Sequence, residues 1–145
     1  MLFRSGTTWA QQAYIKSDAP PKAEAGDRFG FSVALDGGGA TLAVGVYDEG
    51  GAARRVNGPI DAMRNGSGAA YVFTRTASGW ARQAYIKTWN AERGDSWGIA
   101  VALSDDGNTL AVGSADEDCL CSGILHAAPA VAEEDRKSTR LNSSH

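Results

Sequence analysis

Short runs in which large and small residues alternate, separated by turns, dominate the chain. In Phe29–Leu35 (FGFSVAL) the side chains of Phe31, Val33 and Leu35 alternate with glycine, serine and alanine. Alternation with a period of two predicts a β-strand, here with one bulky face and one small face. A small face lets a neighbouring sheet approach closely, and the bulky side chains of that neighbour fill the gap. The pattern therefore predicts stacked sheets.

The pattern occurs more than once along the chain. Phe29–Gly45 (FGFSVALDGGGATLAVG) is matched by Trp97–Gly113 (WGIAVALSDDGNTLAVG). A second pair of predicted strands, Trp9–Lys16 (WAQQAYIK) and Trp80–Lys87 (WARQAYIK), differs at a single position. Repetition over this length indicates that one supersecondary unit is built at least twice.

The order of the predicted elements is strand, tight turn, strand, long loop, strand, short turn, strand. The tight turns are Asp36–Gly39 and Asp105–Asn108, which are rich in residues that tolerate positive φ. The long loop is Val46–Ser67, and the third strand follows in Gly68–Thr74. A repeated four-stranded antiparallel meander predicts an all-β fold, a partial β-propeller. In a meander the long loop and the connector Thr88–Ser96 open at the same end of the sheet.

The repeat divides the chain into predicted segments. Residues 1–16 form the end of a preceding blade, and residues 17–87 form a connector and one complete blade. Residues 88–134 form a second connector and the first half of the next blade. The remaining residues, 135–145 (DRKSTRLNSSH), resemble the translation of a sequencing-library adapter, and we expect a non-native, disordered tail. The natural protein is therefore expected to continue beyond this fragment of one full blade and parts of two neighbours.

Composition and charge narrow the classes of function. The 145 residues carry a formal net charge of −3, with 43% hydrophobic and 21% charged residues, which is ordinary for a globular domain. The weak negative charge predicts no nucleic-acid binding, and no run reaches the roughly 18 apolar residues of a membrane span. No export signal is recognisable. Cys119 and Cys121 are interpreted as loop thiols, because their spacing would strain a disulfide and they lack the further ligands of a closed metal site.

The repeated motifs resemble the FG-GAP repeats of integrin α-like β-propellers. The residues that carry the resemblance are Phe29-Gly30 for "FG", Gly68-Ala69 for "GA", and the runs Val33–Leu35, Leu42–Gly45 and Trp80–Lys87. Trp97 replaces the Phe in the second copy, and Ala70 stands where the family has Pro. The resemblance implies a seven-bladed propeller of a secreted or cell-surface protein. It also implies a binding scaffold, with a protein or glycan ligand on the long-loop face and the remaining blades as neighbours.

The resemblance also raises the question of calcium. Such blades often hold calcium in the turn between their first two strands, but Asp36–Gly39 offers one carboxylate and Ser104–Asn108 only two adjacent ones. Calcium takes six to eight oxygen ligands, so both turns are interpreted as ordinary hairpins. Acidic residues also follow the second strand of each repeat: Asp48, Glu49, Asp116, Glu117 and Asp118. They are candidate calcium ligands, and a solvated, loop-structuring cluster is the alternative. We expect no other cofactor.

No set of nucleophile, base and orienting residue is recognisable, so we expect no enzyme activity in this chain. Gly26-Asp27 and Gly94-Asp95 repeat, and the aspartates are expected to make loop hydrogen bonds at the start of each inner strand. The candidate interaction residues lie on loops of the long-loop face: Arg54, Arg55, Met63 and Trp89. Two alternatives stay open, namely a non-catalytic part of a larger propeller-containing enzyme and a calcium-stabilised structural repeat.

Overall fold

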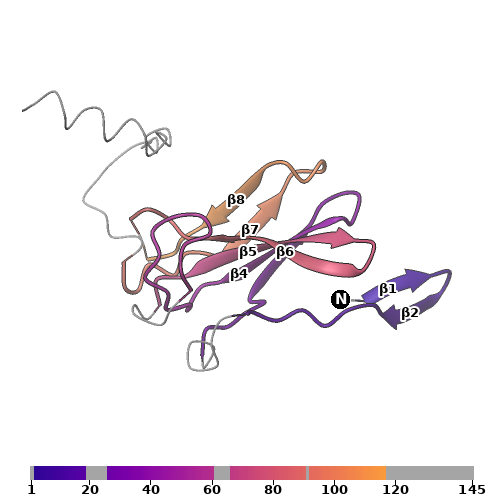
Figure 1. Cartoon of the computed structure of the whole chain (residues 1–145), viewed down its shortest axis with the longest axis horizontal. Helices are drawn as coiled ribbons and strands as arrows, with labels where there is room; N and C mark the ends of the chain where they lie inside the picture. Colours follow the sequence, from indigo (N-terminus) through magenta and orange to yellow (C-terminus); the bar gives the residue numbers. More distant parts are fainter. Residues whose placement is uncertain (1, 19–25, 61–65, 91, 117–145) are drawn as a thin grey trace, which may run out of the picture.

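The computed structural model describes residues 2–18, 26–60, 66–90 and 92–116. These residues form three antiparallel β-sheets and no helix (Figure 1), which confirms the predicted all-β class. Within them, accordingly, there is no apolar helix of the length that a membrane crossing requires. The strands are β1 (Leu2–Ser5), β2 (Thr8–Gln11), β3 (Ser32–Leu35), β4 (Thr41–Val46), β5 (Ala69–Thr76), β6 (Gly79–Ile86), β7 (Ala100–Leu103) and β8 (Leu110–Gly113).

Strands β3, β4, β5 and β6 form one four-stranded sheet in chain order, which is the predicted meander. Its bulky face, as the strand register defines it, carries Val33, Leu35, Leu42, Val44, Tyr71, Phe73 and Tyr85. Its small face carries Ser32, Ala34, Ala43, Gly45, Ala70 and Ala84, and on β5 and β6 also Val72 and Ile86. The predicted separation of large and small side chains therefore holds on β3 and β4, whereas β5 and β6 carry large side chains on both faces.

The hydrophobic core lies on the bulky face of this sheet. Its buried members are Leu42, Val44, Val46, Ala53, Ala69, Tyr71, Phe73 and Tyr85. Phe29 packs edge-on against Tyr71 with 5.6 Å between ring centroids, while Ile15 and Ile60 pack around the same cluster. Aromatic side chains of this size bury large apolar areas. These rings therefore hold the first connector, which precedes β3, and the long loop to the sheet.

Hairpin β7–β8 reproduces the first half of the four-stranded sheet. Val101 pairs with Val112, as Val33 pairs with Val44 in β3 and β4. The identical register confirms that the sequence repeat is a structural repeat.

Hairpin β1–β2 reproduces the tip of hairpin β5–β6, which is the second half of the four-stranded sheet. Arg4 pairs with Trp9, as Arg75 pairs with Trp80 in β5 and β6. β2 ends at Gln11, although the matching residues of β6 continue in the strand as far as Ile86. Gln11 pairs with Leu2, the first residue of β1, so within the described residues no strand lies opposite the residues that follow Gln11.

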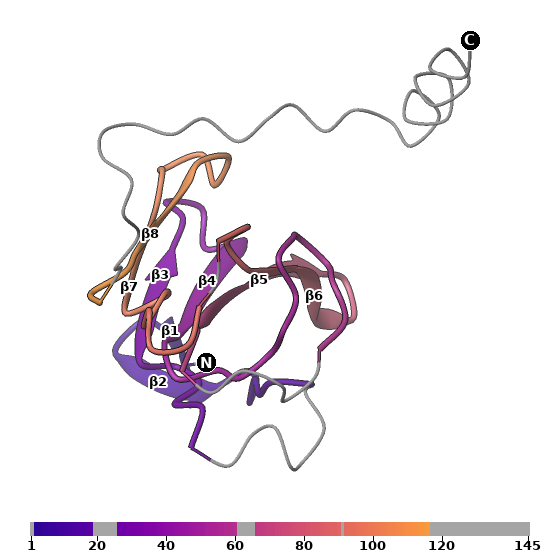
Figure 2. The same cartoon turned by 90° about the vertical axis from the view of Figure 1, so that its left-hand side faces the viewer.

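The two repeats stack, as Figure 2 shows, because β7 packs against β3 and β4. The hydroxyl of Ser32 on the small face donates to the Gly98 carbonyl at 2.9 Å. On β7, Leu103 is half-buried whereas Ala100 and Ala102 are exposed. The bulky side of the second repeat thus faces the small side of the first, as the alternation predicts.

Two glycines, Gly68 and Gly98, lie where the backbones of the two repeats touch. Gly68 forms an isolated parallel bridge with Trp97, and a Cβ on Gly68 would lie 1.9 Å from the Trp97 carbonyl oxygen. Gly98 has φ 95°, and a Cβ there would lie 2.3 Å from the Ala69 carbonyl oxygen. Contacts this short exclude a side chain at either position. Gly68 of the "GA" dipeptide in the first repeat and Gly98, the counterpart of the "FG" glycine in the second repeat, therefore belong to one contact.

The inner strands begin later than the alternation predicts. β3 begins at Ser32 rather than Phe29, because the backbone amide of Phe31 donates to the Arg28 carbonyl in a turn. Arg28 and Gly30 adopt positive φ of 61° and 86°, which is incompatible with a strand. The "FG" dipeptide therefore belongs to a turn that leads the chain into the strand.

Candidate functional site

The long loop and the connector meet at one end of the stacked sheets, the end that Figure 2 looks onto. The backbone amides of Gly94 and Ser96 donate to the Gly66 carbonyl at 3.1 and 3.2 Å, and Trp97 donates to Ser67 at 3.3 Å. We call this end, residues 47–60, 66–68, 88–90 and 92–97, the loop face. The predicted common location of the two loops is confirmed.

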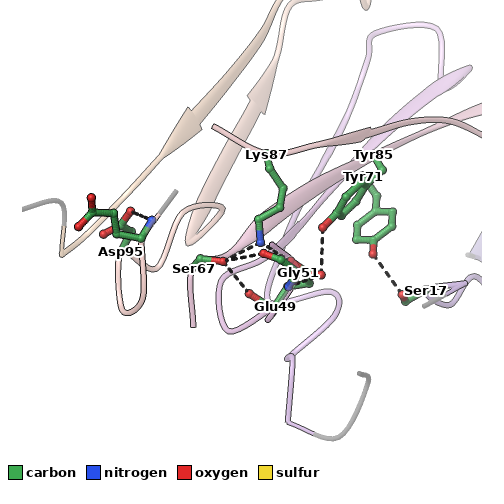
Figure 3. A network of polar contacts seen from close by, with 9 residues as sticks. Ser17, Glu49, Gly51, Ser67, Tyr71, Tyr85, Lys87 and Asp95 are labelled. Atoms are coloured by element: carbon green, nitrogen blue, oxygen red, sulfur yellow. Dashed lines mark hydrogen bonds and ion pairs between the residues drawn. The ribbon is translucent and has the colours of Figure 1, made fainter. Parts of the chain in front are cut away.

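Glu49 lies at the centre of a buried polar network on the loop face (Figure 3). Its side chain is 1% exposed and that of Lys87 is 0% exposed. The ammonium of Lys87 lies 2.5 Å from Glu49 Oε2 and donates to Ser67 Oγ at 2.7 Å. Glu49 Oε1 accepts from the hydroxyl of Tyr85 at 3.0 Å and from the amide of Gly51 at 2.9 Å. Both carboxylate oxygens therefore have donors, which compensates for the burial of the charges.

The network joins the two ends of the long loop. The Ser67 hydroxyl lies 3.3 Å from the carbonyl oxygens of both Glu49 and Gly51, and the amide of Gly68 donates to the Glu49 carbonyl at 2.9 Å. Lys87 adds the end of β6 to the same cluster. Hydrogen bonds therefore fix the base of the loop to the residues at the start of β5 and at the end of β6.

The middle of the loop is held against the edge of β6. The amide of Asn57 donates to the Tyr85 carbonyl at 2.6 Å, and Asn57 Oδ1 accepts from the Tyr85 amide at 2.9 Å. Ala53 is buried in the core. Between these two anchors Arg54, Arg55 and Val56 are exposed. The loop therefore presents two cationic side chains and one apolar side chain from a fixed backbone.

The described candidate metal ligands lie in separate local interactions. Asp48 pairs with Arg28 at 3.7 Å, Glu49 is part of the buried network, and Asp116 accepts from the Ser96 hydroxyl at 3.0 Å. Within the described ranges, no group of three or more His, Cys, Asp or Glu residues is arranged to hold a metal ion. Glu117 and Asp118 lie outside those ranges, so the calcium site stays a prediction.

The described candidate interaction residues lie on the loop face. Arg54 and Arg55 are exposed on the long loop, and neither forms an ion pair with another described residue. Trp89 is 55% exposed on the connector. Met63 lies outside the described residues, as do Cys119 and Cys121 and the tail 135–145. A binding role for these side chains stays a prediction.

The repeated aspartates act within their own loops. Asp95 is 1% exposed, and its Oδ2 accepts from the amide of Glu92 at 2.6 Å (Figure 3). Its backbone carbonyl accepts from Ser114. The predicted loop hydrogen bond before the inner strand is therefore confirmed for Asp95. Asp27, its counterpart in the first repeat, is buried as well.

The tight turns lie at the opposite end of the sheets and use their own carboxylates. Asp36 Oδ1 accepts from the Ala40 amide at 2.7 Å. Desolvation acts to raise the pKa of Asp36, but the hydrogen bonds of the turn outweigh it and lower the pKa. Hydrogen bonds from the Ser104 hydroxyl and then from Asn108 hold the pKa of Asp106 below its ordinary value. These contacts are those of hairpin turns in which a carboxylate accepts backbone hydrogen bonds.

The pairing of Glu49 with Lys87 is the main feature that the sequence interpretation missed. Lys87 is the last residue of a repeated strand, where a lysine is usually solvated. A signal was nevertheless present, because Tyr85 and Lys87 recur as Tyr14 and Lys16. A lysine and a tyrosine that recur together in a repeat whose loop carries a glutamate suggest a polar contact within the unit, which the structure shows for Tyr85 and Lys87, whereas Tyr14 and Lys16 are exposed.

Comparisons with protein-family models, with curated proteins and with solved structures found no match. The FG-GAP resemblance therefore stays a prediction that rests on the sequence motifs.

Proposed function

We propose that this chain is part of an FG-GAP-type β-propeller of a secreted or cell-surface protein, and that the propeller is a scaffold whose loop face binds a protein or glycan ligand. The observation that carries the proposal is the glycine-lined contact between consecutive repeats. Gly68 and Gly98 leave no room for a side chain, so each repeat is built to receive the next. Units that bury their faces on neighbours are typical of propellers and other repeat folds.

The arrangement of the contact supports a radial arrangement of blades. β7 packs on β3 and β4, the first two strands of the preceding meander. Packing concentrated on the first strands of successive units is expected where these strands line a central axis and the later strands diverge from it. In that arrangement β3 and β7 are the inner strands of adjacent blades.

The build of the loop face supports binding rather than a purely structural role. The long loop is held at its base by the Glu49–Lys87 pair and at its middle by Asn57. Loops whose conformation is fixed before binding lose little entropy on association. The exposed residues include arginine and tryptophan, the types that contribute most at protein interfaces. We infer that Arg54, Arg55 and Trp89 contact the ligand.

The proposal is tested by binding of the labelled chain to a glycan array and to immobilised extracellular-matrix proteins. We expect at least one surface to bind, and expect the triple variant Arg54→Ala, Arg55→Ala, Trp89→Ala to reduce that signal at least tenfold. The matched control is Arg75→Ala, an exposed arginine on β5 outside the loop face. Absence of binding to every surface, or an equal loss in the control, would contradict the proposal.

A further inference from the structure

The exposed charges of the loop face are mainly positive. Arg54, Arg55 and Arg93 are exposed, and none of them forms an ion pair with another described residue. Against these three cations, the described part of the face exposes one carboxylate without a cationic partner, that of Glu92. Residues 61–65 of the long loop contain one aspartate and one arginine, whose formal charges cancel. The loop face is therefore a basic area on a chain whose formal net charge is −3.

The other carboxylates of the loop face are engaged within the chain. Glu49 pairs with Lys87 in the interior, and Asp48 pairs with Arg28 at 3.7 Å. Asp95 is buried and accepts a hydrogen bond from a backbone amide of its own connector. These carboxylates therefore do not neutralise the exposed arginines of the long loop.

The arginines of the long loop lie on a closed turn, residues 53–58, which we call the arginine turn. Gly58 is buried, and a Cβ there would lie 2.7 Å from the Cβ of Ala53, so the two ends of the turn touch. Asn57 adopts a positive φ of 54°, and its backbone and side chain attach the turn to β6. Residues 54–56 between these anchors are exposed. The turn therefore presents its side chains from a backbone that is fixed before a ligand arrives, which lowers the entropy lost on binding.

Two exposed apolar side chains accompany these arginines. Val56 belongs to the arginine turn itself, and Trp89 lies on the connector. Asn57 of the turn is bonded to Tyr85, which precedes Trp89 by four residues. Four residues span at most about 14 Å of chain, which is the length of about four or five extended residues of a ligand. One short peptide therefore reaches both the arginine turn and Trp89.

The chemistry of the arginine turn favours a peptide ligand with carboxylates. The planar guanidinium group donates two parallel hydrogen bonds to a carboxylate, a geometry that a lysine does not offer. A sulfated glycan also carries negative charge, but basic patches that bind such polymers consist of runs of many lysines and arginines. Here two arginines lie with an exposed valine and an exposed tryptophan. Tryptophan and arginine are the residue types that contribute most where proteins meet.

We propose that the arginine turn and Trp89 bind an acidic peptide segment of a partner protein. Carboxylates of the segment pair with Arg54 and Arg55, while an apolar side chain of the segment packs on Val56 and Trp89. This inference rests on the proposed binding role of the loop face and names the ligand of that face. The acidic remainder of the chain does not prevent the approach, because charges more than about 8 Å away are largely screened at physiological salt.

A peptide array tests this ligand directly. Its peptides contain every arrangement of glutamate, glutamine, phenylalanine and glycine over the central positions, and the labelled chain is the probe. We expect the strongest signals from peptides that combine at least two glutamates with a phenylalanine. Replacement of those glutamates by glutamine should weaken binding by about tenfold or more, because the arginines lose their charge-assisted pairs. Equal signals from glutamate and glutamine peptides would overturn the proposal.

Variants of the chain assign the preference to the arginine turn. Fluorescence anisotropy with the strongest labelled peptide and its glutamine analogue measures the ratio of the two affinities. Arg54→Gln, Arg55→Gln should bring this ratio close to one, whereas Trp89→Ala should weaken both peptides alike. Arg54→Lys, Arg55→Lys keeps the charge without the planar fork, and should retain part of the preference.

The matched control is Arg75→Gln, which removes an exposed arginine outside the loop face and should leave the ratio unchanged. A ratio that falls equally in Arg75→Gln would show that the net charge of the chain, not the arginine turn, selects the peptide, and would overturn the proposal. Circular dichroism of each variant monitors the fold.

A heparin oligosaccharide and the matrix proteins, measured in the same way, separate this inference from the proposed function. If heparin binds more tightly than every peptide and Arg54→Gln, Arg55→Gln abolishes that binding, the ligand is a sulfated glycan. The acidic peptide is then wrong, while the loop face remains a binding surface. If peptides, heparin and matrix proteins all fail to bind, both the ligand and the binding role of the loop face are wrong.

Discussion

At the scale of single residues, the Glu49–Lys87 pair is the most consequential interaction on the loop face. Both side chains are almost fully buried, and the charge of each is compensated by the other and by polar neighbours. Such a pair adds little to the free energy of unfolding compared with apolar residues of the same volume. The loss of one partner, however, leaves an uncompensated charge in the interior. The pair therefore specifies the position of the loop more than it adds stability.

Lys87→Met should lower the free energy of unfolding by about 3–5 kcal/mol, because Glu49 is left buried without its cation. The double variant Glu49→Gln, Lys87→Met should recover part of this loss. Lys16→Met is the matched control, since Lys16 is the exposed counterpart and its replacement should change stability by less than about 0.5 kcal/mol. Urea unfolding followed by tryptophan fluorescence measures all three. Equal effects at Lys87 and Lys16 would contradict the buried network.

Gly98 and Gly30 offer a second matched pair at this scale. Both residues have positive φ, 95° and 86°, so an alanine is strained to a similar extent at either position. Only at Gly98 would the added Cβ meet backbone, at 2.3 Å from the Ala69 carbonyl oxygen. At concentrations where the chain is monomeric, Gly98→Ala should destabilise by about 1–3 kcal/mol more than Gly30→Ala. Thermal unfolding gives this difference, and equal midpoints would argue against close packing of the two repeats.

At the scale of elements, the described part of the long loop, residues 47–60 and 66–67, is attached to the sheet. Its middle is attached to β6 through both hydrogen bonds between Asn57 and Tyr85. Loops with few attachments open easily and are cut by proteases, whereas a loop fixed at its base and middle resists. The attachment accounts for how a long stretch without periodicity holds a defined conformation.

Asn57→Ala should release the middle of this loop, because the amide of Tyr85 loses its side-chain acceptor. Limited digestion with trypsin, which cleaves after Arg54 and Arg55, should become at least several times faster in the variant. Asn108→Ala, in the tight turn at the opposite end, should leave the rate of cleavage at these two arginines unchanged. An unchanged rate in Asn57→Ala would show that the clamp does not hold the loop.

The elements also show which features the sequence could predict. The hairpins and the bulky and small faces were predictable, because alternation and turn residues are local signals. The start of β3 was not, because the turn at Arg28–Phe31 depends on positive φ at a residue other than glycine. The burial of Lys87 was not predictable from its own strand, since it requires Glu49 from a loop far away in the sequence. The loop face was predicted as a location, whereas its internal attachments follow only from tertiary packing.

At the scale of the whole molecule, the chain consists of one finished sheet and two half-sheets. The half-sheets have the registers of the two halves of the finished one, and the exposed small face of β7 is the counterpart of the face of β3 on which β7 packs. Stability in stacked repeats comes from interfaces between neighbours, so uncovered faces weaken the units at either end. We therefore expect a chain that gains stability whenever a further unit covers Val33 and Leu35.

The central claim is that the two repeats stack through their glycine-lined backbones, and nuclear Overhauser effects across that contact test it most directly. Gly45 lies against Gly98, where an added Cβ would be 2.0 Å from the Gly98 carbonyl oxygen. We predict strong effects between the Hα protons of Gly45 and the backbone protons of Gly98 and Ile99. Effects confined within β3–β6 and within β7–β8, with none between them, would contradict the account.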